Sequence, residues 1–274
     1  MPELPEVETV KRTLKKLIVG KTIQDVSVYL PRIIRRPDDV ELFRHHLTGT
    51  TITDVRRRGK FLKINCDPWV LVSHLRMEGK YRLAEQDEPL EKHTHVLFHF
   101  TDGTELRYRD VRQFGTMDLF RLGEEDHHLP LAKLGPEPLS EDFTPEWLLK
   151  TLPEKKSKIK AVLLNQEYLA GLGNIYVDES LHLAGLHPER NASSLSPEEI
   201  RRLYHAIRKT LADAVEAGGS SVRSYLNGQG EMGMFQLKIQ VYGRKGEPCN
   251  RCGHPIQRIV VAGRGTHLCA ECQR

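Results

Sequence analysis

The last 26 residues of the chain contain four of its five cysteines, and their spacing restricts how this segment can fold. They form two Cys-x2-Cys pairs, Cys249 with Cys252 and Cys269 with Cys272, separated by 16 residues. The pattern between the pairs is typical of a strand, a turn and a second strand. Four thiolates in this arrangement can close a tetrahedral site around one zinc ion, and a site with all four positions filled is typically structural.

Disulfide bonds are the alternative use of paired cysteines, and secreted proteins favour them. No secretory signal is visible, because Glu3, Glu6 and Glu8 stand where a signal peptide has its apolar region. We therefore expect one structural zinc ion. The fifth cysteine, Cys66, lies in an apolar segment that is predicted to be a strand, and we expect it to be buried in the core.

Length and composition indicate a soluble, globular protein with room for two domains. The chain has 274 residues, of which 39% are hydrophobic and 28% are charged. No apolar run approaches the roughly 20 residues that a helix needs to span a bilayer. We expect a cytoplasmic protein without a membrane partner.

Positive charge is concentrated near the end of the chain. Residues 233–274 carry seven Lys or Arg and two Glu, a net charge of +5, whereas the whole chain carries +4. Two further basic runs lie at 56–60 and 155–160. One such run is usually a solvated face, but a basic tail together with basic patches favours a polyanionic partner.

The spacing of apolar residues divides the chain into a strand-rich first part and a helical second part. A helix is predicted over 5–19, and an Asp102-Gly103 turn predicts a hairpin, because such a pair can supply the positive φ angles of a tight turn. One helix with many antiparallel strands favours a β-sandwich or a barrel. Strands are predicted over residues 22–30, 51–55, 60–66, 69–75, 95–100 and 105–109.

A linker is predicted at residues 134–139, where two prolines interrupt both helix and strand. Helices are predicted beyond it, over residues 143–151, 157–167, 174–184 and 197–217. The last helix has a capping-box pattern, with Ser196 as the cap and Glu199 three residues later.

The first residues combine groups that favour nucleophilic catalysis. Removal of Met1 would leave Pro2 with a free secondary amine, and the usual α-amino pKa of about 7.7–8.0 leaves part of such a group unprotonated at neutral pH. Glu3 and Glu6 place two carboxylates within one helical turn of this amine, where they can transfer protons. The alternative is an ordinary helix start, since Pro and Glu both favour first turns.

Two glycine-containing motifs are candidate phosphate contacts. In residues 171–176, Asn174 can cap a following helix whose N-terminus then offers free N–H groups to a phosphate. In residues 263–265, two glycines flank Arg264 at the predicted turn of the cysteine-rich hairpin, where its guanidinium can bind a phosphate. The alternatives are a plain helix connection and an ordinary turn with an exposed arginine.

Residues 75–79 and 110–115 each combine arginine with a large apolar side chain near the end of a predicted strand. Enzymes that act on a base must extract it from the duplex and fill the space that it leaves. Met77 and Phe114 are suitable wedges for this, and Arg112 can satisfy the orphaned base. The alternative, which the pattern alone favours, is that Met77 and Phe114 are buried in a core.

Together these motifs resemble the formamidopyrimidine-DNA glycosylase family along the whole chain. Leu4 matches the branch that acts on oxidised purines, whereas the related endonuclease-VIII-like branch usually has glycine there. The resemblance rests on residues 2–6, 58–60, 110–115, 173–176 and 263–265 and on the four cysteines, in this order.

The resemblance implies an α+β multidomain fold. Residues 1–133 would form an N-terminal antiparallel β-sandwich catalytic domain with an N-terminal helix, and 134–142 a linker. Residues 143–234 would form a helical helix–two-turn–helix domain with a lesion-recognition loop. Residues 235–274 would form a zinc-finger β-hairpin with four cysteine ligands.

The resemblance also implies a bifunctional glycosylase and AP lyase of base-excision repair that removes 8-oxoguanine and formamidopyrimidines from double-stranded DNA. Pro2 would be the nucleophile, Glu3 the proton donor in ring opening and Glu6 a further catalytic carboxylate. Lys60 would assist β-elimination, and Arg264 would act in δ-elimination while it holds a phosphate. The zinc ion would keep Arg264 in place.

The remaining implied sites are DNA contacts and a lesion pocket. Lys156 is the implied family contact, and either of the adjacent lysines Lys155 and Lys156 could make it. The resemblance further implies a monomer of bacterial type that works in the cytoplasm, at the nucleoid. The implied DNA contacts are His93, Arg112, Lys156, Asn174, Met77 and Phe114, and the implied pocket residues are Glu78, Ser220, Arg223, Ser224 and Tyr225.

One departure is Gln113, where many relatives have a second basic residue, and we expect it to lower phosphate affinity slightly. Two alternative functions remain open. The first is an oxidised-pyrimidine glycosylase of the sister branch, which activity on thymine glycol would identify. The second is a DNA-binding protein without enzymatic activity, which retention of Met1 would favour.

Overall fold

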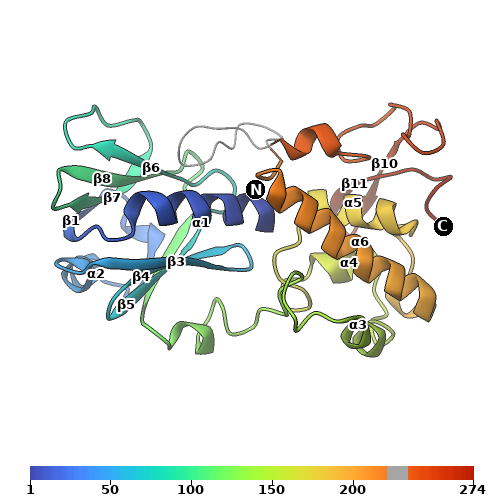
Figure 1. Cartoon of the computed structure of the whole chain (residues 1–274), viewed down its shortest axis with the longest axis horizontal. Coiled ribbons are helices and arrows are strands. Elements are labelled where there is room, and N and C mark those ends of the chain that lie inside the picture. Colours follow the sequence, from blue (N-terminus) through green and yellow to red (C-terminus); the bar gives the residue numbers. More distant parts are fainter. Residues whose placement is uncertain (221–233) are drawn as a thin grey trace. The chain divides into compact units, whose positions relative to one another are not determined.

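The computed structural model describes residues 1–220 and 234–274, which form two compact units (Figure 1). The first unit comprises Met1–Ala132 and includes Ser220, and the second comprises Lys133–Gly219 and Met234–Arg274. Within these described residues, every helix is too short or too polar to cross a membrane.

The first unit is a sandwich of two sheets, so the sandwich and not the barrel is observed. One sheet has the strand order β2-β9-β5-β4-β3 and the other β1-β7-β8-β6. Strands β2 and β9 pair in parallel, and the other neighbours are antiparallel. The strands are β1 (Ile23–Val28), β2 (Ile34–Arg36), β3 (Ile52–Arg58), β4 (Phe61–Cys66), β5 (Trp69–His74), β6 (Lys80–Glu85), β7 (Thr94–Phe100), β8 (Thr104–Arg109) and β9 (Thr116–Arg121).

Helix α1 (Leu4–Ile18) packs against β3 in this unit. The helix predicted over 5–19 is confirmed, and its side chains Val7, Leu14 and Ile18 are fully buried in the hydrophobic core of the unit. Pro5 lies in the first turn, where its missing N–H leaves no helical hydrogen bond unmade. Cys66 is buried as expected, and burial raises the pKa of its thiol to about 12.

Four elements of the first unit are not predicted by the sequence pattern: β2, β6, β9 and the helix α2 (Val40–Leu47). Strand β9 is almost wholly buried, and it includes the charged Asp118, which interrupts its apolar run. Helix α2 has only eight residues, and the Asp39 side chain caps it by accepting hydrogen bonds from two backbone N–H groups at 2.8 and 3.0 Å.

The Asp102-Gly103 turn between β7 and β8 forms where it was predicted, but by a different mechanism. Only Gly103 has a positive φ angle, at 86°. Asp102 instead accepts a hydrogen bond from the Thr104 N–H at 3.0 Å, so its side chain closes the turn.

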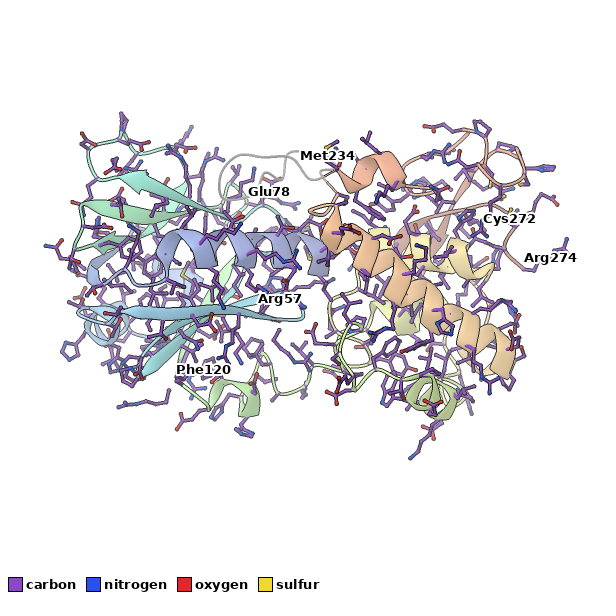
Figure 2. All side chains as sticks on the ribbon, in the orientation of Figure 1. Arg57, Glu78, Phe120, Met234, Cys272 and Arg274 are labelled. Carbon is purple, nitrogen blue, oxygen red and sulfur yellow. The ribbon has the colours of Figure 1, made fainter. Side chains whose placement is uncertain are left out.

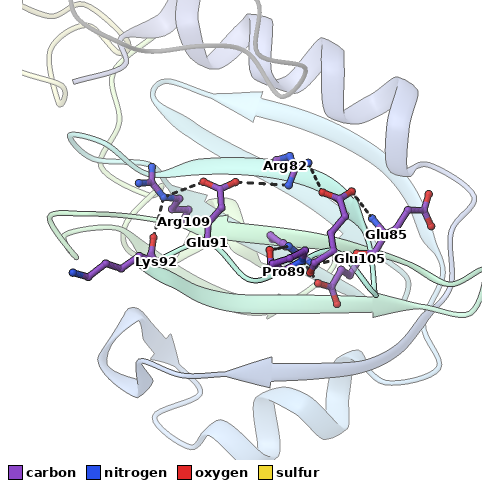
Figure 3. Close-up of polar contacts among 9 residues, drawn as sticks. Arg82, Glu85, Pro89, Glu91, Lys92, Glu105 and Arg109 are labelled. Atoms are coloured by element: carbon purple, nitrogen blue, oxygen red, sulfur yellow. Dashed lines mark hydrogen bonds and ion pairs between the residues drawn. The ribbon is translucent and has the colours of Figure 1, made fainter.

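Arg107 and Arg109 hold the segment 85–93 against β8, and Figure 3 shows Arg109 beside Lys92. The buried guanidinium of Arg107 donates to three backbone carbonyls of this segment, at 2.7–3.0 Å. Arg109 donates to the carbonyl of Lys92 at 3.0 Å. These bonds fix the backbone that leads to His93.

The second unit consists of helices and a C-terminal hairpin. The capping box of its longest helix is confirmed, because the Ser196 N–H donates to Glu199 Oε2 at 2.8 Å and the Glu199 N–H donates to Ser196 Oγ at 3.3 Å. The elements are α3 (Pro145–Thr151), α4 (Ile159–Leu164), α5 (Asn174–Ala184), α6 (Pro197–Glu216), β10 (Gln257–Val261) and β11 (Arg264–Leu268). Short 3-10 turns lie at Pro31–Ile33, Glu125–His127, Ala192–Ser194 and Phe235–Lys238.

Candidate functional site

The start of α1 brings two buried carboxylates next to Pro2. Glu3 and Glu6 are 3% and 4% exposed, and Pro2 is also buried. The Glu3 N–H donates to Glu6 Oε2 at 2.8 Å. The other oxygen of Glu6 accepts hydrogen bonds from the N–H of Ser220 at 2.7 Å and from its hydroxyl at 3.2 Å. Glu6 is therefore held from two segments that are far apart in the sequence.

Lys60 lies in a two-residue turn between β3 and β4, because Arg58 pairs directly with Phe61. The preceding residue, Gly59, has a φ angle of 55°, which only glycine adopts without strain. Lys60 is only 5% exposed. The turn thus presents an ammonium group in a largely water-excluded place, and such lysines are suited to proton transfer.

Arg57 ties this turn to α1, and it lies beside that helix in Figure 2. Its guanidinium bonds to Glu8 Oε2 at 3.1 Å and donates to the carbonyl of Gly59 at 2.8 Å. Arg57 therefore connects the helix that follows Pro2 to the turn that carries Lys60 within the first unit.

His74 anchors the loop 75–79. Its Nδ1 accepts a hydrogen bond from the Arg76 N–H at 2.9 Å. Burial, together with the positive charges of Arg76, Lys60 and Arg35, lowers the pKa of His74 to about 3. The ring is therefore neutral at pH 7, as an acceptor at Nδ1 requires.

Asp110 shapes the second loop, 110–115. Its fully buried carboxylate accepts hydrogen bonds from the backbone N–H groups of Arg112, Phe114 and Gly115 at 3.1, 2.9 and 2.8 Å. Three N–H donors on one carboxylate leave the backbone of this loop little freedom.

The two loops hold their apolar side chains in solvent, so the interpretation of these residues as core is wrong. Met77 is 38% exposed and Phe114 is 53% exposed. The Arg112 guanidinium lies 5.0 Å from the centre of the Phe114 ring. Glu78, a predicted pocket residue that follows Met77 in the chain, is also exposed, and Figure 2 labels it.

Asn174 does not cap α5 as its position suggests. Gly173 occupies the cap position, and the Asn174 side-chain amide donates to the carbonyl of Gly265 at 2.8 Å. Among the described residues its buried Oδ1 has no hydrogen-bond partner. Asn174 thus connects the N-terminus of α5 to the start of β11.

Arg264 is the first residue of β11 and not part of the turn, which is a correction to the predicted position. Val261 pairs with Arg264, so the turn consists of Ala262 and Gly263, with φ angles of 49° and 73°. Within the part of the chain that the structure covers, the exposed Arg264 guanidinium makes no hydrogen bond or ion pair.

A buried ion pair supports β11 from the helices. Lys160 Nζ lies 2.6 Å from Asp178 Oδ1, and both side chains are fully buried. The second oxygen of Asp178 accepts a hydrogen bond from the His267 N–H at 2.8 Å, and Lys160 also donates to the carbonyl of Gly265 at 3.3 Å. These bonds join the strand of Arg264 to α4 and α5.

Of the two adjacent candidate lysines, both are exposed. The Lys155 ammonium lies 5.5 Å from the centre of the Tyr168 ring. Lys156 makes no hydrogen bond or ion pair with any residue whose placement is described. Both ammonium groups are exposed, so the choice between the two lysines stays a prediction.

The four paired cysteines converge on one point and form the zinc site. All four sulfur atoms lie within 4.8 Å of one another. Cys249 and Cys272 are 3.9 Å apart, and Cys252 and Cys269 are 3.4 Å apart. Tetrahedral Zn–S bonds of about 2.3 Å place sulfurs roughly 3.8 Å from each other, so the donor set fits one zinc ion.

Three predicted pocket residues, Arg223, Ser224 and Tyr225, lie outside the described residues. Sequence reasoning missed the residues that support the site, chiefly Arg57, His74, Asp110 and the Lys160–Asp178 pair. Only the role of Asp110 could have been predicted from the local sequence, since aspartate often accepts hydrogen bonds from the N–H groups that follow it. The others depend on segments that are distant in the sequence.

Models of three protein families match the chain in order. They are described as the formamidopyrimidine-DNA glycosylase N-terminal domain, over residues 1–117, the formamidopyrimidine-DNA glycosylase H2TH domain, over 134–225, and a zinc finger found in FPG and IleRS, over 246–274.

Similar proteins and structures carry the same description. A formamidopyrimidine-DNA glycosylase of Brevibacillus brevis is 63% identical over 274 residues, which cover 100% of this chain and 99% of that protein. One of Bacillus licheniformis is 58% identical, with 100% of both chains covered. The crystal structure of Lactococcus lactis Fpg with DNA containing N7-benzyl-Fapy-dG has a TM-score of 0.93 at 47% identity, with 100% of both chains covered. The complex of that enzyme with abasic-site DNA has a TM-score of 0.94 at 46% identity, with 99% of both chains covered.

Proposed function

The chain belongs to the formamidopyrimidine-DNA glycosylase family, and we propose the residues with which it performs that family's reaction. The protein is a DNA base-excision repair enzyme, a glycosylase with AP lyase activity, and it carries a structural zinc site. Its substrates are oxidised purines in duplex DNA. The observation that carries the assignment of residues is the pair of buried, hydrogen-bonded residues Glu3 and Glu6 directly after Pro2 in the first unit.

In the proposed first step, the secondary amine of Pro2 attacks the anomeric carbon of the damaged nucleotide after Met1 has been removed. A carbon–nitrogen bond forms, the bond to the base breaks, and the base leaves with a proton. Glu3 donates a proton to the ring oxygen as the sugar opens, which leaves an iminium ion on Pro2. The position of Glu3 supports this role, because its buried side chain belongs to the residue directly after Pro2.

Elimination follows, because the iminium ion makes the proton on the neighbouring sugar carbon acidic. Loss of that proton expels the 3′ phosphate in the β-elimination, and Lys60 assists it from its turn. A second loss of a proton expels the 5′ phosphate in the δ-elimination, with Arg264 as the proton donor that also holds phosphate. Water is not the nucleophile of these steps.

The proposed DNA contacts follow from charge and exposure. Lys156 and Arg264 have cationic groups without a partner among the described residues, and bound phosphates would supply one. The N-terminus of α5 at Asn174 offers further N–H donors. His93 and Arg112 complete the set of proposed backbone contacts, and Met77, Arg112 and Phe114 fill the space of the extruded nucleotide.

Glu78 and the segment that begins at Ser220 are proposed to line the lesion pocket. The four cysteines position Arg264 through the hairpin that they close. The division into domains at 133/134, 142/143 and 234/235 also stays a proposal, as do a monomeric state and a cytoplasmic location.

Covalent trapping tests the central step. The purified protein is mixed with a duplex that contains 8-oxoguanine opposite cytosine, in the presence of borohydride, and the adduct is mapped by mass spectrometry. An adduct on an N-terminal Pro2 is expected. An adduct on another residue would contradict the assignment, and trapping only on thymine-glycol duplexes would move the protein to the pyrimidine branch.

A further inference from the structure

Met77 and Phe114 are large apolar side chains of the first unit that are exposed to solvent. Exposed apolar groups on loops are usually mobile, and ordering them upon binding costs conformational entropy. Both loops are nevertheless held by buried groups at their bases, so the side chains extend from rigid backbones.

The loop 75–79 is closed on itself. The Gly79 N–H donates to the carbonyl of Leu75 at 2.9 Å, and His74 fixes the N–H of Arg76. Arg76 has a φ angle of 53°, a strained conformation for a residue with a side chain. Such a conformation persists only where the surroundings impose it.

The loop 110–115 has the same properties. Its N–H groups converge on the Asp110 carboxylate, and Gln113 has a φ angle of 57°. Asp110 also accepts a hydrogen bond from the hydroxyl of Tyr108, at 3.4 Å.

Tyr108 lies against both loops at once. A Cβ atom added to Gly115 would lie 1.7 Å from Tyr108 Oη, and one added to Gly79 would lie 2.4 Å from it. The hydroxyl is therefore packed between the backbones of two glycines, one at the end of each loop. Tyr108 is fully buried in β8, so it cannot move aside without disturbing the sheet.

We propose that Tyr108 and Asp110 are positioning residues that hold Met77 and Phe114 as a single preformed wedge. This inference rests on the proposed function, and it adds that the wedge is built before DNA binds. Because the wedge meets the orphaned base, its position also sets the preference for the base opposite the lesion. Tyr108 and Asp110 act only through the loops and do not touch the substrate.

The test compares Tyr108→Phe with Tyr81→Phe. Tyr81 is a matched control, because it is also buried in the sandwich, with its ring 5.1 Å from that of Tyr108, yet its hydroxyl donates to Ser73 Oγ instead. Three rates are measured: excision of 8-oxoguanine opposite cytosine, excision opposite adenine, and cleavage of a single-stranded oligonucleotide with an abasic site, which has no orphaned base.

We expect Tyr108→Phe to slow excision from the cytosine duplex about tenfold and to reduce the preference for cytosine over adenine. Cleavage of the single-stranded substrate should stay within about twofold of the wild type. Tyr81→Phe should change neither the preference nor the ratio of duplex to single-stranded activity.

Equal behaviour of the two variants would overturn the proposal, and so would an equal loss on all three substrates. Asp110→Asn is the second variant, in case Tyr108→Phe unfolds, and its amide should give the same selective loss on duplexes. Failure of the proposed function is distinguishable, because the wild-type enzyme would then form no borohydride adduct on Pro2.

Discussion

The carboxylate of Glu6 accepts a hydrogen bond from the backbone N–H of Ser220 at 2.7 Å, although 214 positions separate the two residues. Its other oxygen accepts the N–H of Glu3 at 2.8 Å. One buried side chain therefore joins the proposed catalytic N-terminus to the beginning of the proposed lesion loop. We therefore expect a change at Glu6 to affect the geometry at Pro2.

Glu6→Gln should weaken this link. A glutamine has one acceptor oxygen instead of two, and its NH₂ group would face an N–H donor. Loss of one charge-assisted hydrogen bond in a buried place costs about 1.5–3 kcal/mol of unfolding free energy. We expect borohydride trapping on an 8-oxoguanine duplex to slow about tenfold. Glu41→Gln, which changes an exposed carboxylate of α2, is the control, and an equal effect of both changes on trapping would contradict this specific role.

Removal of zinc should unfold the C-terminal hairpin selectively. Among the described residues, its small buried cluster consists of two cysteines together with Val241 and Ile256. Such a core cannot offset the conformational entropy of the segment without the metal, whose binding contributes about 10–16 kcal/mol in zinc fingers. Cys252→Ser should therefore lower zinc content, measured by atomic absorption, and make β10 sensitive to protease. Cys66→Ala is expected to retain one zinc ion per chain.

Local sequence patterns predicted much of the fold. The cysteine spacing predicted the metal site, and Ser196 with Glu199 predicted the start of α6, since both signals depend on residues close in sequence. The strand β9 was missed because the buried Asp118 interrupts its apolar run. Burial raises the pKa of this carboxyl, although Arg35, Arg36 and Arg76 oppose the shift.

The supporting residues of the site could not be predicted in the same way. The proposed positioning role of Tyr108 depends on two glycines from separate loops that pack against its hydroxyl. A sequence pattern along one strand cannot predict such a contact between distant segments. Met77 and Phe114 look like core residues in the sequence, and only the folded chain shows that they are exposed. Burial is a tertiary property, whereas capping and metal-ligand spacing are local ones.

Gly135→Ala should destabilise the second unit. A Cβ atom at this position would lie 2.3 Å from the backbone carbonyl oxygen of Tyr168, which cannot move aside by changing a rotamer. We expect a loss of about 1–3 kcal/mol of unfolding free energy, measured by urea denaturation. Gly265→Ala is the matched control, because its Cβ would meet the end of the flexible Arg258 side chain at 2.8 Å. A loss of the same size in both variants would refute the steric argument.

His74 should make the enzyme less stable below pH 6. Burial lowers its pKa in the folded state to about 3, whereas the unfolded chain takes up a proton near the ordinary value of about 6.5. The contribution of the neutral His74 ring to the free energy of unfolding is therefore fully present above pH 6.5, and it is lost as the pH falls towards 3. Each pH unit in that window costs up to about 1.4 kcal/mol.

His74→Asn should remove this contribution to the pH dependence. Its side-chain oxygen can still accept the N–H of Arg76, but it does not titrate. The measurement is the free energy of unfolding of both proteins at pH 7 and pH 5. Parallel losses in the two proteins would show that His74 does not cause the dependence.

Arg264→Gln should separate the two elimination steps. Arg264 begins β11 with an exposed guanidinium, and its strand is held by the buried pair of Lys160 and Asp178. Without the guanidinium, the δ-elimination loses its proposed proton donor and a phosphate contact. We expect products of β-elimination to accumulate on denaturing gels, with δ-products reduced by about 10²-fold. Arg258→Gln, which removes an exposed charge from the neighbouring strand, is expected to weaken DNA binding slightly and to leave the product ratio unchanged. If both substitutions changed the ratio equally, the effect would come from the charge of the hairpin, and Arg264 would have no special part in the chemistry.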